Sequence, residues 1–270
     1  MSKDNHSGMV NEIDRRRGAK GERRKLRLDL RIMAEENMRK LAANPYPGRG
    51  IILGLSPDGR SMIQIYWLMG RSENSRNRIL VEEANGFVKT QAFDAQKVTD
   101  PSLIIYYPVK HFGAYHLVTN GDQTETLYEL LPQGQSFESA LKTRTYEPDP
   151  PNYTPRISGL VDLGDPDYAY RLALIKAAGN NPDCPVYAFY YYKKGIPGFG
   201  HCLHTYAGDG NPVPPFAGEP YLVKVFNDGA ENADYYWRLL NAENKVALLV
   251  KTIRLEDGKA EIRIVNKHQA

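Results

Sequence analysis

Residues 70–78 form the densest polar cluster of the chain, with three arginines among hydroxyl and amide side chains. Arginine can bind a phosphate bidentately, and the neighbouring amides and hydroxyls could reach a ribose. The lysine and the glycine spacing of a Walker loop are missing. The cluster therefore fits either an anion-binding loop or a solvated loop between strands, and composition alone gives the two equal weight.

A second polar stretch, residues 146–158, contains four prolines. Proline fixes φ, so the side chains carried by this stretch would be held with little conformational entropy left to lose. It displays two carboxylates, Glu147 and Asp149, together with Asn152 and Arg156. Such a segment suits a binding site, and it equally suits a rigid surface connection.

The segment 198–212 carries His201, Cys202 and His204. In a strand, His201 and His204 would point to opposite faces, which leaves Cys202 and His204 on one face. No second pair at metal-ligand spacing accompanies them, so we expect no metal site. A thiol activated by a nearby imidazole is one reading of Cys202, and a buried cysteine in a strand is the commoner outcome.

Two further segments consist of an apolar run followed by polar residues. Residues 103–108 predict a buried strand that ends in Tyr106 and Tyr107. Residues 118–124 predict a strand that passes through a glycine turn into a helix, which Asn120 or Asp122 could cap. That turn could also offer backbone N–H groups to an anion.

Hairpins dominate the elements that must position these groups. Turn residues predict antiparallel pairs at 49–56 with 61–68, 79–83 with 87–93, and 245–255 with 259–265. Further strands are expected at 103–107, 115–119, 186–193, 201–206 and 221–226, and helices at 124–131, 136–146, 168–178 and 233–241. Because strands and helices do not alternate regularly, we expect an α+β fold with antiparallel sheets, in a single domain over residues 44–270.

Composition excludes several classes. The 270 residues are 41% hydrophobic and 25% charged, a profile with which a soluble chain can bury a core. Two cysteines are too few for a disulfide scaffold and suit a reducing compartment. No apolar run approaches the roughly 20 residues of a membrane span, and the polar N-terminus lacks a signal core. We therefore expect a cytoplasmic protein with no membrane contact.

The net charge of +3 is unevenly distributed. Residues 1–43 carry 12 Lys/Arg and 7 Asp/Glu, a balance of +5, whereas residues 44–270 carry 23 and 25, a balance of −2. Helical and strand periods compete around residues 26–33, so the element type stays open. We expect residues 1–43 to be a basic extension, partly helical or disordered, and its lack of aromatic residues makes nucleic acid an unexpected partner.

Five segments occur together in the order of a known family: residues 44–50, 70–78, 119–124, 146–158 and 201–212. Over roughly residues 44–266 the chain resembles the archaeal-type IMP cyclohydrolases and their bacterial relatives. The resemblance implies a four-layer αββα sandwich with antiparallel sheets, like that of the N-terminal-nucleophile hydrolases. Because the first strand is entered through residues 46–49, with no Cys, Ser or Thr beside it, we expect no self-processing.

The resemblance also implies a reaction, the closure of 5-formamidoimidazole-4-carboxamide ribotide to inosine monophosphate (IMP) with loss of water, in purine biosynthesis. The partners expected on this basis are these purine nucleotides, and family members often form homo-oligomers. Closure within one molecule depends mainly on positioning, proton transfer and oxyanion stabilisation. It requires no metal, redox group or other cofactor.

Matching the family motifs to this chain assigns roles residue by residue. The resemblance implies that a first group holds the ribose phosphate and lines the base: Arg49, Arg71, Ser72, Asn74 and Arg78. Asn152 and Thr154 would recognise the ring edge. Tyr106 would polarise an oxygen or donate a proton, and either Glu147 or Asp149, positioned by Arg156, would transfer the proton. Tyr107 stands where the family usually has asparagine.

Two other readings stay open. A nucleotide-binding module without catalysis would keep the pocket and use the basic extension to contact nucleic acid or a partner. An amidohydrolase would instead use Cys202 as its nucleophile.

Overall fold

Two antiparallel sheets form the body of the protein in the computed structural model, which describes residues 5–98 and 105–269, with side chains of the first helix at Glu22 and from Lys25 onward. The six-stranded sheet has the order β11 (Tyr221–Lys224), β10 (Phe199–His204), β1 (Gly50–Leu55), β2 (Ser61–Met69), β12 (Lys245–Arg254), β13 (Ala260–Asn266). The seven-stranded sheet runs in chain order: β3 (Arg78–Glu82), β4 (Val88–Ala92), β5 (Val109–Phe112), β6 (Tyr115–Thr119), β7 (Arg156–Asp162), β8 (Tyr170–Ala178), β9 (Asn181–Tyr192).

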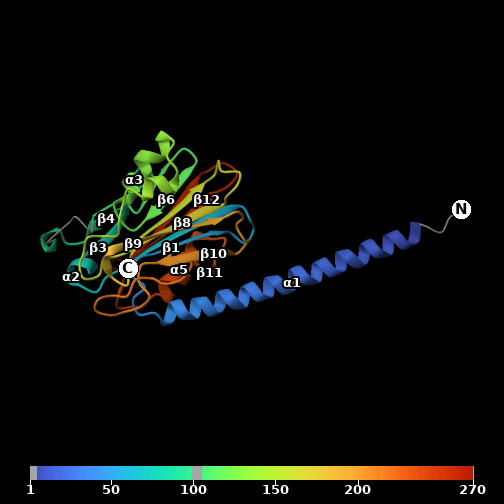
Figure 1. Cartoon of the computed structure of the whole chain (residues 1–270), viewed down its shortest axis with the longest axis horizontal. Helices are drawn as coiled ribbons and strands as arrows, with labels where there is room; N and C mark the ends of the chain where they lie inside the picture. The colour runs from blue at the N-terminus through green and yellow to red at the C-terminus, as the bar shows by residue number, and fades with distance from the viewer. Residues whose placement is uncertain (1–4, 99–104, 270) are drawn as a thin grey trace.

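The helices lie outside the sheets (Figure 1). They are α1 (Asn5–Ala43), α2 (Glu73–Arg76), α3 (Gln123–Leu130), α4 (Phe137–Leu141) and α5 (Gly229–Leu239), with short 3₁₀ turns η1 (Ala95–Lys97), η2 (Leu131–Gln133) and η3 (Lys267–Gln269). The expected α+β class with antiparallel sheets is therefore confirmed, and the three predicted hairpins pair as β1–β2, β3–β4 and β12–β13.

Apolar side chains fill the space between the sheets. Ile51 and Leu53 of β1 meet Val118 of β6 and Ile157 of β7 in this core. The sheets approach closely at Gly159 of β7, where an added Cβ would lie 2.9 Å from Val118 and 3.0 Å from Leu53. A larger residue at this position would force the two sheets apart, so this glycine sets how near β1 and β7 can come.

Each sheet also buries its outer face. The end of α1 and helix α5 cover the six-stranded sheet, with Met38, Leu41 and Tyr236 against Ile65 and Trp67. Helices α3 and α4 cover the seven-stranded sheet through Leu127, Phe137 and Leu141. Both faces of each sheet are therefore packed.

One element predicted from the sequence is wrong. Residues 168–178 were expected to form a helix, and they form strand β8 instead. Leu172 and Leu174 face the inter-sheet core, whereas Ala173 and Ile175 face α3 and α4. A strand that is buried on both faces has no polar alternation, so its Leu and Ala content reads as helical.

Other boundaries differ from the expectation. The helix expected at 136–146 is shorter, because α4 ends at Leu141. The expected strand at 103–107 falls partly outside the described residues, and 105–107 are not assigned to a strand. Strands β5 and β7 were not predicted, and β7 follows directly on the proline-rich stretch that reads as a loop.

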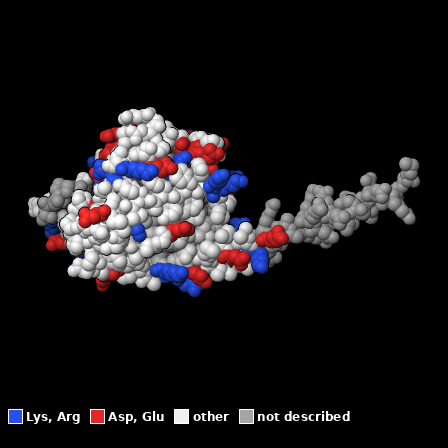
Figure 2. Space-filling model, viewed as in Figure 1, with Lys and Arg blue, Asp and Glu red and all other residues white. Residues whose placement is uncertain are grey.

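Residues 5–43 of the basic extension form the single helix α1, which settles the element type left open around residues 26–33. Its last turns bury Ala34, Met38 and Leu41 on the body, and Glu35 pairs with Lys224 of β11 at 2.5 Å. Figure 1 shows the rest of α1 extending away from the sheets. On the face in Figure 2, basic and acidic side chains are interspersed over the body. Within the described residues no helix is long and apolar enough to cross a membrane.

The inter-sheet core also contains polar side chains. Gln64 of β2, His116 of β6 and Lys251 of β12 are fully buried or nearly so. Both ring nitrogens of His116 and the Lys251 Nζ find no hydrogen-bond partner among the residues described. Burial lowers the pKa of His116 to about 3 and that of Lys251 to about 8.

This histidine makes folding sensitive to acid. The unfolded state protonates His116 near its ordinary pKa of about 6.5, whereas the folded state does so near 3, so the unfolded state binds more protons between these values. Stability is therefore lost as the pH falls below about 6.5. We expect His116→Phe to reduce the loss of unfolding free energy between pH 7 and pH 5 by about 2 kcal/mol, measured by urea unfolding. Replacing the exposed His268 by Phe is the matched control, and an unchanged pH slope in His116→Phe would contradict this reading.

Candidate functional site

A buried ion pair between Arg49 and Glu147 joins two separate segments of the candidate site. Arg49 lies just before β1, and its Nη2 donates to both carboxylate oxygens of Glu147, at 2.8 and 2.7 Å. Glu147 belongs to the proline-rich segment, and its backbone N–H donates to the carbonyl of Thr154 at 2.9 Å. The exposed fractions of the two residues are 9% and 4%. Burial raises the pKa of the Glu147 carboxyl, which the charges of Arg49 and Arg156 only partly oppose.

Two tyrosines lie beside this pair. The hydroxyls of Tyr66, in β2, and Tyr106 are 2.7 Å apart, and the charge of Arg49 acts on both rings. The Tyr106 backbone is fixed by Thr90 of β4, whose Oγ1 accepts its N–H at 2.9 Å. Burial raises the pKa of Tyr66, so this hydroxyl keeps its proton. The hydrogen-bonded pair of phenols lies between the two sheets, near the Arg49–Glu147 pair.

Arg156, the first residue of β7, is anchored by the turn after β6. Its Nη1 donates to Gln123 at 2.7 Å and pairs with Asp122 at 2.6 Å, and its Nε donates to the carbonyl of Thr145 at 2.8 Å. Asp122 occupies the N-cap position of α3 but makes no capping hydrogen bond, so the expected cap is wrong. Its carboxylate instead binds Arg144 and Arg156.

Gly121 and Asn120 lie in the same turn after β6, next to Arg156. An added Cβ at Gly121 would lie 2.7 Å from Arg156 Nη1 and 3.4 Å from Glu147 Oε1. Asn120 is not a cap either: its Oδ1 accepts the backbone N–H of Ile157 at 2.8 Å, and its Nδ2 donates to Pro155 at 2.9 Å. The turn therefore leaves room for the ionic groups and ties the proline-rich segment to β6.

Asp149 is occupied by a neighbouring threonine. Its Oδ1 accepts the Thr154 backbone N–H at 2.6 Å, and its Oδ2 accepts the Thr154 hydroxyl at 2.5 Å. The same hydroxyl contacts Tyr206, whose ring stacks on Tyr46 at 5.6 Å. Asp149 thus holds the segment in shape, with both of its oxygens engaged.

The fold places the arginines of the polar cluster at residues 70–78 in different environments. Arg78 is buried, donates to the Ser75 carbonyl at 2.9 Å, and its charge acts on Tyr66. Arg71 is half exposed, pairs with Asp209 and lies 4.8 Å over the ring of Tyr46.

Three other predicted residues play local parts in the structure. Ser72 caps α2 through a capping box with Ser75. The buried Oδ1 of Asn74 has no hydrogen-bond partner among the residues described. Asn152 accepts the backbone N–H of Val213 at 3.0 Å.

Contacts and charge interactions therefore bring seven of the predicted residues together: Arg49, Arg78, Tyr106, Glu147, Asp149, Thr154 and Arg156. Arg71 is connected to them through Tyr46 and Tyr206, whereas Ser72 and Asn152 stabilise neighbouring turns. The residues missed from the sequence are Tyr66, Gln123 and Tyr206. Tyr66 lies in an apolar strand pattern, so the only sequence signal for a functional role is its hydroxyl group.

The histidines of β10 face opposite sides, as expected for a strand. His201 reaches the Tyr170 hydroxyl across the inter-sheet space at 2.7 Å, whereas His204 lies on the side of α1. Cys202 is fully buried, and burial raises the pKa of its thiol to about 12. A thiolate is therefore not accessible there at neutral pH, which argues against Cys202 as a nucleophile.

Within the part of the chain that the structure describes, no three His, Cys, Asp or Glu side chains are placed to hold a metal ion.

Comparison with known proteins agrees with the sequence motifs. The sequence model of a family described as IMP cyclohydrolase-like protein matches residues 46–258. An IMP cyclohydrolase of Methanopyrus kandleri (strain AV19) is 33% identical over 121 residues, which are 43% of this chain and 59% of that protein. The chain thus aligns with somewhat more than half the length of this relative.

Proposed function

The chain belongs to the IMP cyclohydrolase-like family, and from this premise we propose that it is an IMP cyclohydrolase. It would close 5-formamidoimidazole-4-carboxamide ribotide to IMP with loss of water. The observation that carries the proposal is the buried Arg49–Glu147 pair beside the Tyr66–Tyr106 hydroxyls. This arrangement supplies a carboxylate with a raised pKa and a phenol donor in one water-poor site.

The proposed fold is the four-layer αββα sandwich of the N-terminal-nucleophile hydrolases, without self-processing. Three buried clusters support it, one between the sheets and one under the helices on each outer face. We also propose that residues 44–270 act as one domain and residues 1–43 as an extension to it. Cytoplasmic location and homo-oligomer formation stay predictions.

The chemistry is intramolecular. The carboxamide nitrogen attacks the formyl carbon, forms the new C–N bond and loses one proton. The formamide nitrogen then loses its proton and forms a double bond to that carbon as the C–O bond breaks, and the former formyl oxygen leaves as water with two protons. Holding the two groups in contact can be worth an effective molarity on the order of 10⁵ M or more. The protein must then accept a proton from the attacking nitrogen and donate one to the departing oxygen.

Glu147 is the proposed proton acceptor. Its raised pKa makes it a stronger base than an ordinary carboxylate, and Arg49 fixes both of its oxygens. Asp149 is the alternative candidate, and its two oxygens hold the backbone N–H and the hydroxyl of Thr154 within its own segment. Arg156 acts as a positioning residue through its charge on Glu147 and its bonds to Gln123 and Asp122.

Tyr106 is the proposed donor to the formyl oxygen, with Tyr66 orienting its hydroxyl. The ribose phosphate is assigned to residues 70–78, where Arg71 and Arg78 carry the charge, with Ser72 and Asn74 as neutral donors. Thr154 and Asn152 are assigned to the ring edge.

We expect Tyr106→Phe to lower kcat by about 10²-fold with little change in KM, because it removes a group used mainly in the transition state. Tyr107→Phe is the matched control, since that hydroxyl donates to Glu83 at 3.2 Å instead. Initial rates with both variants test the assignment. Equal kinetics for the two would remove Tyr106 from the mechanism.

The activity itself is tested by incubating purified protein with the formylated ribotide and following the absorbance of IMP. Turnover well above the uncatalysed rate is the expected result. Tight IMP binding without turnover would overturn the proposal in favour of the nucleotide-binding module without catalysis.

A further inference from the structure

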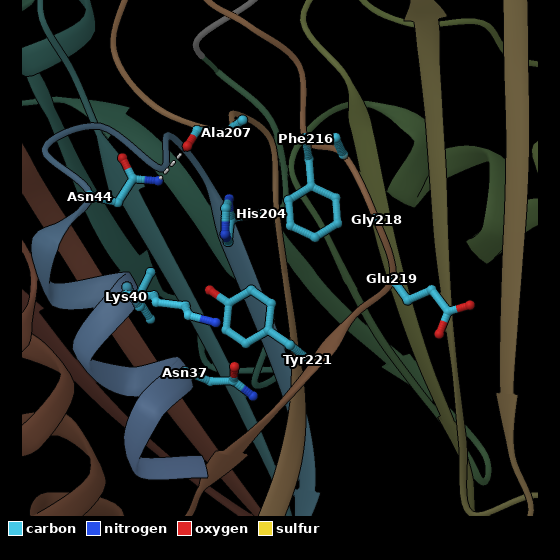
Figure 3. A pocket seen from close by; sticks show the side chains of 11 residues that line it. Asn37, Lys40, Asn44, His204, Ala207, Phe216, Gly218, Glu219 and Tyr221 are labelled. Carbon is cyan, nitrogen blue, oxygen red and sulfur yellow. Dashed lines mark hydrogen bonds between the residues drawn. The ribbon is translucent and has the colours of Figure 1, made fainter. Parts of the chain in front are cut away.

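A cavity of about 320 Å³ lies beneath the end of α1, at the β10–β11 edge of the six-stranded sheet (Figure 3). Asn37 and Lys40 of α1 lie on one wall, and His204 of β10, Phe216 and Tyr221 are among the residues of the others. The volume falls within the range of small-molecule sites. The cavity is distinct from the site between the sheets, and its α1 wall belongs to the extension that precedes residue 46, where the family match begins.

A buried polar side chain of this cavity, His204, offers a hydrogen-bond acceptor. His204 Nδ1 lies 2.8 Å from the carbonyl oxygen of Tyr206, and only a protonated Nδ1 can bond to that oxygen. Burial lowers the pKa of His204 to about 4, so the ring is neutral at pH 7 and its Nε2 carries a lone pair. That atom has no hydrogen bond with any residue of the described chain.

Asn37 adds a second acceptor. Its Nδ2 donates to the Leu222 carbonyl at 3.0 Å, which fixes the amide orientation and leaves Oδ1 directed toward the cavity (Figure 3). Lys40 lies on the same wall and extends along it toward Tyr221, and no carboxylate of the described residues pairs with it. Two acceptors and one cation therefore face the same space.

Two of the other lining side chains are aromatic, and the lining residue Glu219 directs its carboxylate away from Lys40 (Figure 3). Phe216 and Tyr221 lie 6.4 Å apart with an angle of 29° between their rings. The His204 ring meets Phe216 edge-on at 4.7 Å and Tyr221 at 5.6 Å. Such walls favour a flat heteroaromatic ring.

We propose that this cavity is a second, non-catalytic nucleotide site that binds an aminopurine nucleoside monophosphate. The exocyclic amino group has two N–H donors, which match His204 Nε2 and Asn37 Oδ1. The ring packs on Phe216 and Tyr221, and the phosphate pairs with Lys40. Hypoxanthine has no exocyclic amino group, and its C6 substituent is a carbonyl oxygen, so IMP would offer no amino donor to these two acceptors.

Titration calorimetry of the full chain with AMP, GMP and IMP tests this proposal. At least one aminopurine nucleotide should bind one-to-one, and IMP should bind at the cavity at least about 10-fold more weakly. Lys40→Glu should weaken binding of the aminopurine nucleotide by about 10-fold or more while leaving binding of its nucleoside unchanged. The matched control is Lys25→Glu, an exposed position on the same helix, which should change neither.

Two further variants separate this site from the proposed catalytic one. His204→Phe should abolish aminopurine binding, and Glu147→Gln should leave it intact. If His204→Phe does not fold, Lys40→Glu, at an exposed position, still tests the proposal. The proposal is overturned if neither AMP nor GMP binds, if Lys40→Glu removes IMP binding as tight as theirs, or if Lys40→Glu has no effect on aminopurine binding.

Discussion

Replacing Glu147 by glutamine should lower kcat by about 10²–10⁴-fold, the usual contribution of a positioned general base. Glutamine keeps the shape of the side chain and can still accept a hydrogen bond from Arg49, so the loss reports proton transfer more than packing. KM should change much less than kcat, since the proton moves only in the transition state. Steady-state kinetics with the formylated ribotide measure both constants.

The pH profile gives an independent readout of the same residue. Burial raises the pKa of Glu147, so the acid limb of the kcat profile should lie above the range of an ordinary glutamate and vanish in Glu147→Gln. Asp149→Asn is the matched control and should retain that limb. A larger fall of kcat in Asp149→Asn than in Glu147→Gln would transfer the role of base to Asp149.

Replacing Arg49 by methionine should destabilise the protein by about 3–5 kcal/mol, because it leaves the Glu147 carboxylate buried without its partner. The carboxyl can escape this cost only by taking up a proton, so its pKa should rise further. Chemical unfolding at pH 7 measures the loss.

A double variant tests the physical reason. Arg49→Met with Glu147→Gln removes the buried charge, so it should be more stable than Arg49→Met alone. The control Arg71→Met breaks a half-exposed pair with Asp209 and should cost at most about 1 kcal/mol. If Arg49→Met and the double variant were equally unstable, the pair would not be the source of the effect.

Much of the fold follows from local signals. Turns with glycine and strand-like flanks locate hairpins such as β12–β13, which closes at residues 256–258. Strand β8 escapes these rules because both of its faces are buried and its Leu and Ala residues are good helix formers. Strand β7 is not predicted by these local signals because prolines directly precede it.

The site is harder to predict, because it is assembled from distant segments. Arg49 and Glu147 are 98 positions apart, and nothing in either segment shows that they meet. Motif resemblance selects residue types, yet the ion pair, the Tyr66–Tyr106 contact and the Thr154–Asp149 bonds appear only once both sheets are packed. Tyr66 lies among apolar neighbours in the sequence and is therefore interpreted as a core residue.

A crystal structure with IMP bound is the most direct test of where ring closure takes place. The six-membered ring should lie within about 2.6–3.2 Å of both the Glu147 carboxylate and the Tyr106 hydroxyl, with the phosphate directed toward residues 70–78. IMP bound only elsewhere, for example against His204 beneath α1, would contradict the assignment of the catalytic site to the Arg49–Glu147 pair.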